Sequence, residues 1–424
     1  MERAATMMKE SVESVQGARV GLTDRVLRKA LIQRLELIRS GRIIMHEPGG
    51  TVTTFGPQDA ALRAEIGVRD GRFYRACTLG GTVGTAEAYI EGWWTCDRLT
   101  DLIRVFALDR ETLRTLDGGI SRVLSPVNRF LHWLSRNTRE GSRKNIAAHY
   151  DLGNDFFSLF LDPTMMYSCA FFERPGMSLE EASFAKLDRL CRKLALSPED
   201  HLVEIGTGWG GLAIHAASRY GCRVTTTTIS REQARFARDR IASRGLADRI
   251  TVLEKDYRDL EGSYDKLVSI EMIEAVGHQY LPAYLAKCAS LLKPEGVMAI
   301  QAITMQDRDY HAALRQVDFI QKYIFPGSFI PSLGAIQGAM AAGTDLRVVH
   351  IEDIGHHYVR TLACWRESFM ARLDAVRALG FDDAFIRMWD YYFCYCEGAF
   401  AERHIGDAQI VMARSRARPG TLSV

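Results

Sequence analysis

From about residue 185 onward, the sequence alternates between short β-rich runs and helical stretches. The β-rich runs are HLVEIG, CRVTTTTIS, ITVLEKDY, DKLVSIEMI and GVMAIQAIT. Helical stretches such as REQARFARDRIASRG and YLPAYLAKCASLL separate them. This alternation predicts an α/β fold with a doubly wound, mostly parallel sheet, whose ligand site lies at the carboxyl ends of the strands.

The first of these strands runs into a glycine-rich turn. In VEIGTGWGGLAIHAA, Gly206, Gly208 and Gly210 follow Glu204 and precede a helix. Glycines let the backbone turn sharply and let a ligand approach the helix N-terminus. The spacing G-x-G-x-G differs from the dinucleotide fingerprint, and the next strand ends in TTTTIS, without an acid for a ribose hydroxyl, which argues against NAD. The turn resembles motif I of the class I S-adenosylmethionine-dependent methyltransferases.

The composition excludes several classes of protein. The 424 residues include 54 basic and 52 acidic ones, a net charge of +2, which excludes a globally basic nucleic-acid-binding protein. The N-terminal residues carry charges throughout, unlike a signal peptide, and no run of about eighteen apolar residues occurs. The nine cysteines are scattered, without the close pairs of a zinc site, and their odd number argues against a disulfide framework. We therefore expect a reducing, cytoplasmic location.

The region before the alternating pattern predicts a smaller domain and a connector. Residues 1–22 are expected to be mobile, and 23–118 to form a small α+β domain. One face of its first helix carries Leu27, Leu31, Leu35 and Ile38. Residues 119–148 predict an amphipathic connector with a basic face, which would suit an anionic membrane surface, although a solvated helix that only links domains explains it equally well. The basic residues are Arg129, Arg136, Arg139, Arg143 and Lys144.

Several separated motifs narrow the methyltransferase further. They are HYDLGNDFFSLFLDPTMMYSCAFF, EIGTGWGG, TTISREQ, DYRDL, IEAVG, YVRTLACW and CEGAFAERHIGDAQIVMAR. In this order, from residue 149 to the C-terminus, they resemble those of the cyclopropane-fatty-acyl-phospholipid synthase family. The resemblance implies a seven-stranded methyltransferase sheet and an acyl-chain pocket within 149–424, and a lipid-binding or dimerising role for the small domain. It implies an enzyme at the inner face of the membrane that transfers a methylene group from S-adenosylmethionine to the cis double bond of unsaturated phospholipid acyl chains. A homodimer is among the assemblies that the resemblance leads us to expect.

The resemblance also assigns residues to the methyl donor. Those around its methionine part are Glu204, Gly206 and Gly208, and Tyr167, Ser168 and Gly210 also contact the donor. Those near its ribose and adenine are Thr228, Ser230, Gln233, Tyr257 and Arg258. Plain β-propensity explains Thr228 equally well, and Gln233 could be an ordinary helix residue.

In the same family, a bound bicarbonate ion removes a proton from the newly attached methyl group so that the ring closes. The resemblance places this ion among Cys169, Glu274, Gln301, Ile303 and Tyr358. Cys169 and Ile303 are expected to contribute backbone groups. Gln301 stands where the family commonly has histidine, and glutamine exchanges hydrogen bonds but cannot carry a proton. A fatty-acyl C-methyltransferase that leaves a methyl or methylene branch is therefore the alternative.

Two cysteines and three aromatic residues allow more than one interpretation. Cys396 matches a family cysteine once suspected of catalysis, but we expect it to pack, because no neighbouring base in the sequence would activate its thiol. For Cys169, an inert buried thiol is the competing explanation. Tyr167, Phe171 and Phe172 could stabilise a cation on the acyl chain, whereas lining of an apolar channel explains Phe171 and Phe172 equally well.

Two other classes of function compete with a lipid-modifying enzyme. A non-catalytic lipid-binding protein is disfavoured because both the donor-site and the anion-site residues are present. A methyltransferase for small molecules gives no reason for the lipid-type motifs outside the sheet. The histidines His278, His356 and His357 lack the spacing of metal ligands, so no metal is expected.

Overall fold

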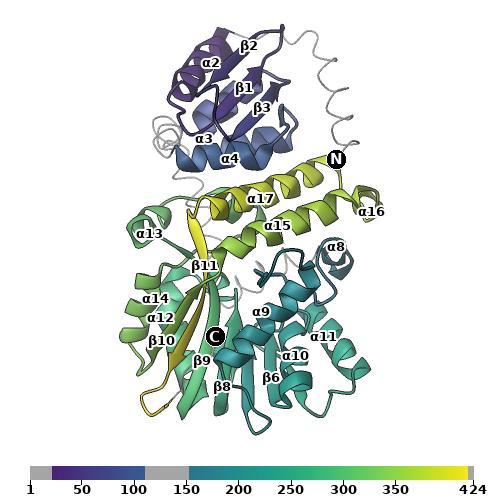
Figure 1. Ribbon diagram of the computed structural model, residues 1–424, viewed down its shortest axis with the longest axis vertical. Helices are drawn as coiled ribbons and strands as arrows, with labels where there is room; N and C mark the ends of the chain where they lie inside the picture. Colours follow the sequence, from purple (N-terminus) through teal and green to yellow (C-terminus); the bar gives the residue numbers. More distant parts are fainter. Residues whose placement is uncertain (1–21, 110–151, 419–424) are drawn as a thin grey trace. The chain divides into compact units, whose positions relative to one another are not determined.

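The computed structural model describes residues 22–109 and 152–418 (Figure 1). These residues form two compact units. The first contains 22–109, 316–322 and 372–404, and the second contains the rest. The predicted connector at 119–148 and nearly all of the predicted mobile start lie outside the described residues.

The first unit is built on a four-stranded sheet with the order β2-β1-β3-β4. Its strands are β1 (Arg42–His46), β2 (Val52–Phe55), β3 (Arg63–Val68) and β4 (Trp94–Cys96), and its early helices are α2 (Leu22–Leu35), α3 (Arg72–Ile90) and α4 (Leu99–Leu108). Strand β1 pairs parallel with β3 and antiparallel with β2. Leu31, Leu35 and Ile38 are buried, so the apolar face predicted for this region packs inward.

Two late helices also belong to the first unit, namely α16 (Leu373–Ala378) and α17 (Asp383–Ala401). The Tyr89 hydroxyl on α3 donates to Asp390 Oδ2 at 2.7 Å, and Arg104 Nε on α4 donates to Glu402 Oε1 at 2.6 Å. These bonds join α17 to helices some 300 residues earlier in the chain. The continuous domain expected over 149–424 is thus interrupted by 316–322 and 372–404.

The second unit is built on a seven-stranded sheet with the order β10-β11-β9-β8-β5-β6-β7. Its strands are β5 (His201–Ile205), β6 (Arg223–Thr228), β7 (Ile250–Glu254), β8 (Tyr264–Ile270), β9 (Leu292–Met305), β10 (Arg347–Asp353) and β11 (Ile405–Ala413). Pairing is parallel from β7 across to β9, and β11 is antiparallel to both of its neighbours. The predicted mostly parallel α/β sheet is confirmed.

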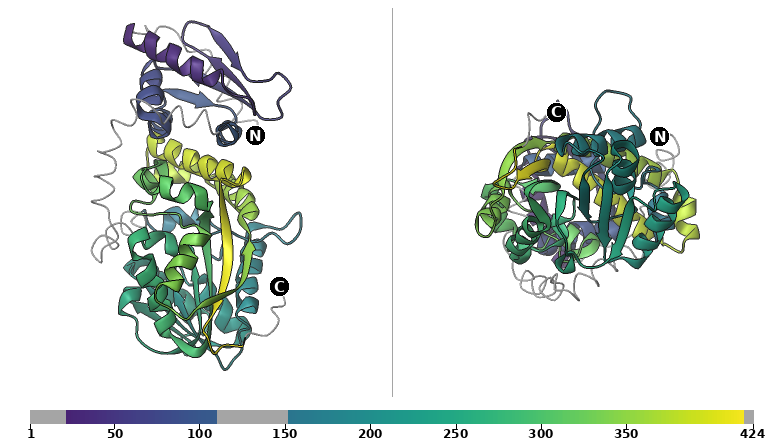
Figure 2. Two further views of the ribbon diagram at one scale, coloured as in Figure 1. Left: turned by 90° about the vertical axis from the view of Figure 1, so that its left-hand side faces the viewer. Right: turned by 90° about the horizontal axis from the view of Figure 1, so that it is seen from below.

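Helices lie on both faces of this sheet (Figures 1 and 2). The α-helices of the unit are α8 (Asn154–Ser158), α9 (Leu179–Lys193), α10 (Gly211–Tyr220), α11 (Arg231–Ser243), α12 (Leu281–Leu291), α13 (Asp307–Ala313), α14 (Leu333–Ala341) and α15 (Gly355–Met370). Its short turns are η1 (Tyr257–Asp259), η2 (Ile273–Ala275) and η3 (His278–Tyr280). The π-helical η4 (Ile320–Ile324) begins in the first unit and ends in the second. One apolar core lies under α9, α10 and α11, and another lies under α12 and α14.

Local signals fix where these helices begin. Ser178 and Glu181 form a capping box at the start of α9, and the Ser230 hydroxyl accepts from the backbone of Gln233 at the start of α11. Gly210 caps α10 in the left-handed conformation, with φ of 85°. In 22–109 and 152–418, no helix combines the length and the apolar character required to cross a bilayer.

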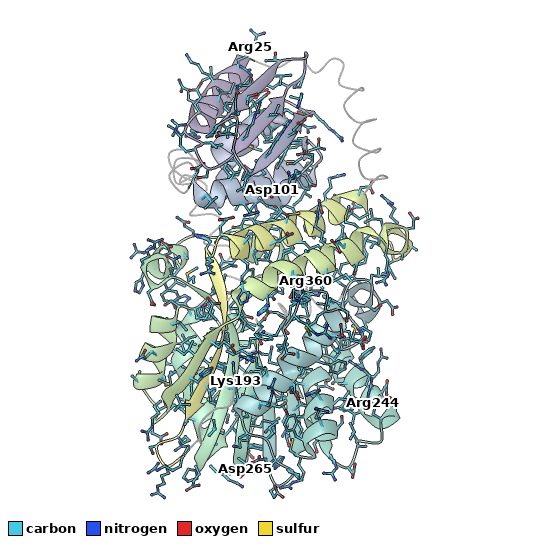
Figure 3. The ribbon with its side chains drawn as sticks, viewed as in Figure 1. Arg25, Asp101, Lys193, Arg244, Asp265 and Arg360 are labelled. Atoms are coloured by element: carbon cyan, nitrogen blue, oxygen red, sulfur yellow. The ribbon has the colours of Figure 1, made fainter. Side chains whose placement is uncertain are left out.

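The pairing of β11 with β9 brings late residues to the edge where the parallel strands end. In this antiparallel register Asp407 faces Ile303, and Gln409 faces Gln301. Helix α15 lies across the same end of the unit. In Figure 3, Arg360 marks α15 at this end, and Asp265, near the start of β8, marks the opposite end of the sheet. Carboxyl ends of parallel strands, the start of β11 and α15 therefore converge at one edge.

We expect Gly355→Ala to destabilise the protein by ~1–3 kcal/mol, because the fold leaves no room for a side chain there. A Cβ at Gly355 would lie 2.7 Å from the backbone nitrogen of Asp407 and 2.9 Å from the Cα of Gly406. The matched control is Gly338→Ala inside α14, where a Cβ would meet nothing within 4 Å. It should gain roughly 0.5–1 kcal/mol from better helix propensity. Urea unfolding measures both, and equal effects would contradict the close packing of α15 on β11.

Candidate active site at the carboxyl edge of the sheet

Three acidic side chains gather at this edge. Glu271 follows the last residue of β8, Glu274 lies on η2, and Asp407 lies on β11. Glu271 and Glu274 are half-buried, whereas Asp407 is fully buried. Buried carboxyl groups require donors or protons, so the contacts of each acid decide what the cluster can do.

The carboxylate of Glu271 accepts three hydrogen bonds from separate segments. The Cys169 backbone N–H and the Gln301 side-chain amide both donate to Oε1 at 2.8 Å. The Tyr358 hydroxyl donates to Oε2 at 2.6 Å. Burial raises the pKa of Glu271, although the hydrogen bonds from Tyr358, Cys169 and Gln301 lower it in part. Because hydrogen bonds to an ionised acceptor are stronger than neutral ones, the three donors make Glu271 the acid of the cluster best suited to carry a negative charge.

The other two acids have fewer partners. Glu274 Oε1 accepts the Ile303 backbone N–H at 2.6 Å, and its buried Oε2 has no hydrogen-bond partner. Burial, with a contribution from Glu271, raises the pKa of Glu274 to about 8. Burial and the two neighbouring glutamates also raise the pKa of Asp407 well above its usual range. Glu274 therefore holds a proton at neutral pH, and the burial of Asp407 favours its neutral form.

A buried lysine offsets part of the negative charge. Lys186 on α9 is fully buried, and its ammonium donates to the Ser168 hydroxyl at 2.6 Å. Burial lowers the pKa of Lys186, while the charges of Glu271 and Asp407 raise it. An ammonium enclosed in this way stabilises the acids around it.

Gln301 is held in one orientation by a chain of polar contacts. Lys193, at the end of α9 against the sheet (Figure 3), donates to Gln409 Oε1 at 2.7 Å. The amide of Gln409 then donates to Gln301 Oε1 at 3.1 Å. A lysine ammonium can only donate, so it fixes the direction of both amides. The amide nitrogen of Gln301 must therefore point to the acids, where it also donates to Asp407 Oδ2 at 3.0 Å.

The residues expected to hold bicarbonate come together, but they do not fit that ion. The donors of Cys169, Gln301 and Tyr358 are already bound by the carboxylate of Glu271. The N–H of Ile303 is bound by Glu274. The expected anion site is thus filled by a carboxylate of the chain, because Glu271 projects into the ring of donors.

The glycine-rich turn fits the methyl donor. Gly206 and Gly208 have φ of 103° and 50°, which an L-residue rarely adopts. A Cβ on Gly208 would meet no atom within 4 Å, so open space lies over the turn at the end of β5. Before it, Glu204 accepts from the Thr226 hydroxyl at 2.6 Å, and burial raises the pKa of Glu204 to about 8. The turn can hold the donor's amino acid part against backbone groups.

The residues expected near the ribose and adenine lie at the ends of the next two strands. The Thr228 hydroxyl donates to Gln233 Oε1 at 3.0 Å, and both side chains are buried. Tyr257 and Arg258 lie on η1, where Arg258 binds Asp256 through two nitrogens, at 2.8 and 2.7 Å. They occupy the edge predicted for the donor, and their contacts with it stay predictions.

Part of the aromatic segment after residue 150 is core. Phe156, Phe157 and Phe160 are buried, and the half-buried Tyr167 packs on them and on Trp365, with ring centroids 5.2 Å apart for Tyr167 and Trp365. Neighbouring rings have cationic partners within the chain: Arg189 lies 4.5 Å from the ring centroid of Phe171, and Arg360 lies 4.5 Å from that of Phe172. Each of these two rings therefore already has a cation beside it. Tyr358 is the aromatic residue bonded to Glu271, and its ring centroid lies 6.0 Å from that of Trp365.

The two candidate cysteines differ in place. Cys169 is fully buried, its thiol donates to the Ala170 carbonyl at 3.3 Å, and burial raises its pKa well above the usual range. Its thiol is packed, while its backbone N–H serves Glu271. Cys396 lies on α17 in the first unit, and burial likewise raises its pKa. Neither thiol has the character of a nucleophile.

Four residues of the cluster were not predicted from the sequence. They are Glu271, Asp407, Lys186 and Gln409. An acid directly after a parallel strand, as Glu271 is in SIEMIEAVG, was a usable signal. The other three carry no local signal, because they enter the site from α9 and from the antiparallel strand β11.

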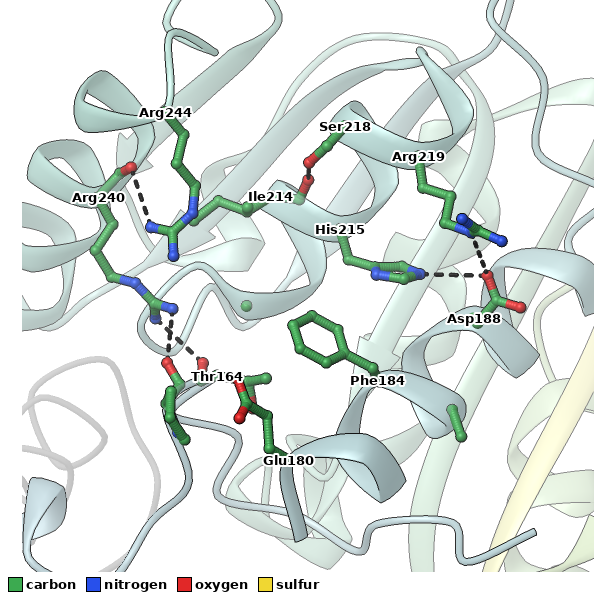
Figure 4. A pocket seen from close by; sticks show the side chains of 13 residues that line it. Thr164, Glu180, Phe184, Asp188, Ile214, His215, Ser218, Arg219, Arg240 and Arg244 are labelled. Atoms are coloured by element: carbon green, nitrogen blue, oxygen red, sulfur yellow. Dashed lines mark hydrogen bonds and ion pairs between the residues drawn. The ribbon is translucent and has the colours of Figure 1, made fainter. Parts of the chain in front are cut away.

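A surface cavity of about 680 Å³ lies elsewhere on the second unit, along α9, α10 and α11 (Figure 4). None of the predicted site residues lines it. Its charged groups are paired locally: Asp188 Oδ1 lies 3.4 Å from His215 Nε2, and Arg240 donates to the carbonyls of Thr164 and Trp209. The acidic cluster, not this cavity, is the candidate active site.

The chain is similar to known proteins over most of its length. The mycolic acid cyclopropane synthetase family matches residues 137–410. Tuberculostearic acid methyltransferase UfaA1 of Mycobacterium tuberculosis is 41% identical over 352 residues, 79% of each chain. Cyclopropane-fatty-acyl-phospholipid synthase of Escherichia coli is 36% identical over 354 residues, 83% of this chain and 88% of that enzyme. The crystal structure of mycolic acid cyclopropane synthase CmaA1 with SAH and CTAB has 32% identity and a TM-score of 0.60, over 64% of this chain and 98% of CmaA1.

We expect Glu204→Gln to stabilise the protein at high pH only. In the folded chain the pKa of Glu204 is about 8, so the carboxyl group keeps its proton until the pH approaches that value. In the unfolded chain the group has its ordinary pKa of 4.5 and loses the proton at much lower pH. Wild-type stability thus falls as pH rises between these values, and at about pH 9 the variant should gain at least roughly 2 kcal/mol, with no gain below about pH 4. Urea unfolding across this range measures it.

Glu352→Gln is the control of opposite sign. Burial alone would raise the pKa of Glu352, but hydrogen bonds from Arg189 and Lys193 bring it down to about 2. The stability that Glu352 contributes is present above the unfolded pKa of about 4.3 and is lost as pH falls towards 2, so this variant should be destabilised at neutral pH. A Glu204→Gln variant with the same pH profile as wild type would contradict a protonated Glu204.

Proposed function

Because the chain belongs to the mycolic acid cyclopropane synthetase family and is an S-adenosylmethionine-dependent methyltransferase, we propose that it adds one carbon to the cis double bond of unsaturated phospholipid acyl chains. The observation that carries this proposal is the carboxylate of Glu271, which three hydrogen bonds hold in place. The next residue, Met272, lies against the glycine turn of the donor site, where its Cγ would be 3.3 Å from a Cβ on Gly206. Methyl transfer to an alkene leaves a cation that must lose a proton. A site with a built-in proton acceptor suits that chemistry.

The chain's own residues supply orientation and shielding. When bound, S-adenosylmethionine supplies an electrophilic methyl group on its sulfonium. An isolated double bond is a weak nucleophile, so the protein must align it and exclude water. The buried aromatic cluster of Phe156, Phe157 and Phe160, with Tyr167 and Trp365, supports an apolar, water-poor surrounding. The faces of Tyr358 and Trp365 suit a transient carbon cation, because aromatic faces attract cations without capturing them.

The product we assign first is the cyclopropane. A base close to the arriving methyl group can take its proton, and the released electron pair then closes the ring. Cys169 and Tyr358, two residues that the resemblance assigns to the proton-transfer site, donate to Glu271, and Ile303 donates to the neighbouring Glu274, which supports this assignment.

A methyl or methylene branch without ring closure is the second candidate. Two observations favour it: Gln301 replaces a residue that could carry a proton, and UfaA1, at 41% identity, is named a methyltransferase. Loss of a proton from a chain carbon beside the cation gives a methyl-branched alkene. A hydride shift from the methylated carbon, followed by loss of a proton from the methyl group, gives a methylene branch.

Phospholipid acyl chains are reached at a membrane surface. The basic residues predicted on the connector at 119–148 support association with an anionic surface. Cytoplasmic location at the inner face of the membrane and assembly as a homodimer stay predictions.

Expression in a host that lacks such an enzyme tests the proposal. We expect host fatty acids to gain one CH2 with the double bond gone, as seen by mass spectrometry after selective derivatisation of alkenes. The same gain with an alkene retained would assign the branched product. No gain in mass, from a protein shown by calorimetry to bind S-adenosylmethionine, would contradict lipid modification.

Tyr358→Phe should lower turnover by roughly 10- to 100-fold with donor binding unchanged, because it removes one donor to Glu271 and none to the glycine turn. Lipid product formation and calorimetry measure the two effects. Tyr310→Phe on α13 removes a hydroxyl outside the acidic cluster and is the matched control. Equal losses of turnover in both variants, or a parallel loss of donor affinity, would contradict the role of Tyr358.

A further inference from the structure

The geometry points to a base that belongs to the chain: we propose that the carboxylate of Glu271 takes the proton in this reaction and makes an external bicarbonate unnecessary. This inference rests on the function proposed above and deepens it. It concerns where the proton goes, not which lipid is used.

The hydrogen bonds to Glu271 are those that an external anion would need. Three segments far apart in the chain converge on its two carboxylate oxygens, through Cys169, Gln301 and Tyr358. The remaining N–H, that of Ile303, is bound by Glu274. Because each of these donors already has a carboxylate partner, a bicarbonate ion would have to displace Glu271.

The backbone at Glu271 supports a role for its side chain. Its φ is 46°, in the left-handed region that favours glycine and costs other residues energy. The conformation is held by the Glu271 N–H, which donates to the Gln301 carbonyl at 2.8 Å. Strain of this kind concentrates at functional sites, and here it aims a carboxylate into the ring of donors.

The charges of the cluster also disfavour an added anion. Glu274 and Asp407 each present a buried carboxyl oxygen without a hydrogen-bond partner. A bicarbonate ion beside them would be a fourth carboxylate-like group, and Lys186 would be the buried cation that could offset its charge. The donors described above already bind carboxylates of the chain, so none of them is left for the ion. Glu274 is less suited to be the base, because its unpartnered Oε2 is buried. We assign Glu274 a positioning role, in which its Oε1 holds the backbone N–H of Ile303.

The step balances without a further reactant. The methyl carbon–sulfur bond breaks and leaves its electron pair on sulfur, and the alkene π pair forms the new carbon–carbon bond. Glu271 then takes a proton from the new methyl group, so that an O–H bond forms and a C–H bond breaks. The C–H electron pair closes the ring, or forms an alkene if the proton comes from the chain. The proton on Glu271 returns to solvent before the next turnover.

Glu271→Gly tests the proposal, because glycine accepts the left-handed backbone and leaves an open ring of donors. In buffer freed of carbon dioxide, wild type should keep its rate of product formation, and the variant should lose at least ~100-fold. Added bicarbonate or formate should restore the variant at least ~10-fold and leave wild type unchanged. Without any methyl donor, bicarbonate should raise the unfolding temperature of the variant only. Calorimetry should give both proteins the same affinity for S-adenosylmethionine.

Ala195→Gly is the matched control, since Ala195 is exposed just beyond α9 and has φ of 48°. It releases the same kind of backbone strain without touching the cluster and should behave as wild type. Loss of wild-type activity on removal of bicarbonate would overturn the proposal, and so would a Glu271→Gly variant that is fully active without an added anion. A variant that binds the donor normally but is rescued by neither anion would also overturn it, in favour of a purely structural Glu271. Wild type that binds the donor but makes no lipid product would instead contradict the function proposed above.

Discussion

The need to satisfy buried carboxyl groups governs the structure of this edge of the sheet. A carboxylate removed from water is costly unless donors surround it. Glu271 obtains its donors from the segment after α8, from β9 and from α15. None of these segments alone could stabilise the charge, so their relative positions in the second unit are tied to it. Glu274 and Asp407 have fewer partners, and burial raises the pKa of both, so that their neutral forms are favoured.

The polar network extends through the protein beyond the cluster. The ammonium of Lys193 bridges Gln409 and Glu352, and Glu352 also binds Arg189. Through Gln409, this surface-facing ion pair decides which atom of Gln301 meets the acids. Glutamine at position 301 therefore acts as an oriented donor, a task that requires no titration. This accounts physically for a residue that differs from the histidine common in the family.

If the base is a carboxylate of the chain and not a free anion, the enzyme does not have to bind an ion from solution before each reaction. A bound ion has to be captured for each protein molecule, and its occupancy depends on its concentration. A side chain is always present at a fixed distance, and orientation of this kind lowers the entropic cost of reaction. The relatives of this chain include one protein named for methyl transfer and one named for cyclopropane formation. Both names are consistent with a single carbon-transfer reaction whose product depends on the carbon that loses the proton.

The sequence by itself determined the α/β sheet and the glycine turn, because periodic apolar runs and the G-x-G-x-G spacing are local patterns. The resemblance to the synthases named Cys169, Glu274, Gln301, Ile303 and Tyr358, which the structure brings to one edge of the sheet. Tertiary structure alone decided which partner each donor meets. Asp407 and Gln409 enter through antiparallel pairing of β11 with β9, a contact between residues about a hundred positions apart. Whether the ring of donors is open to an ion or filled by Glu271 depends on side-chain positions in three dimensions, because a motif names residues but does not say which hydrogen bonds are already made.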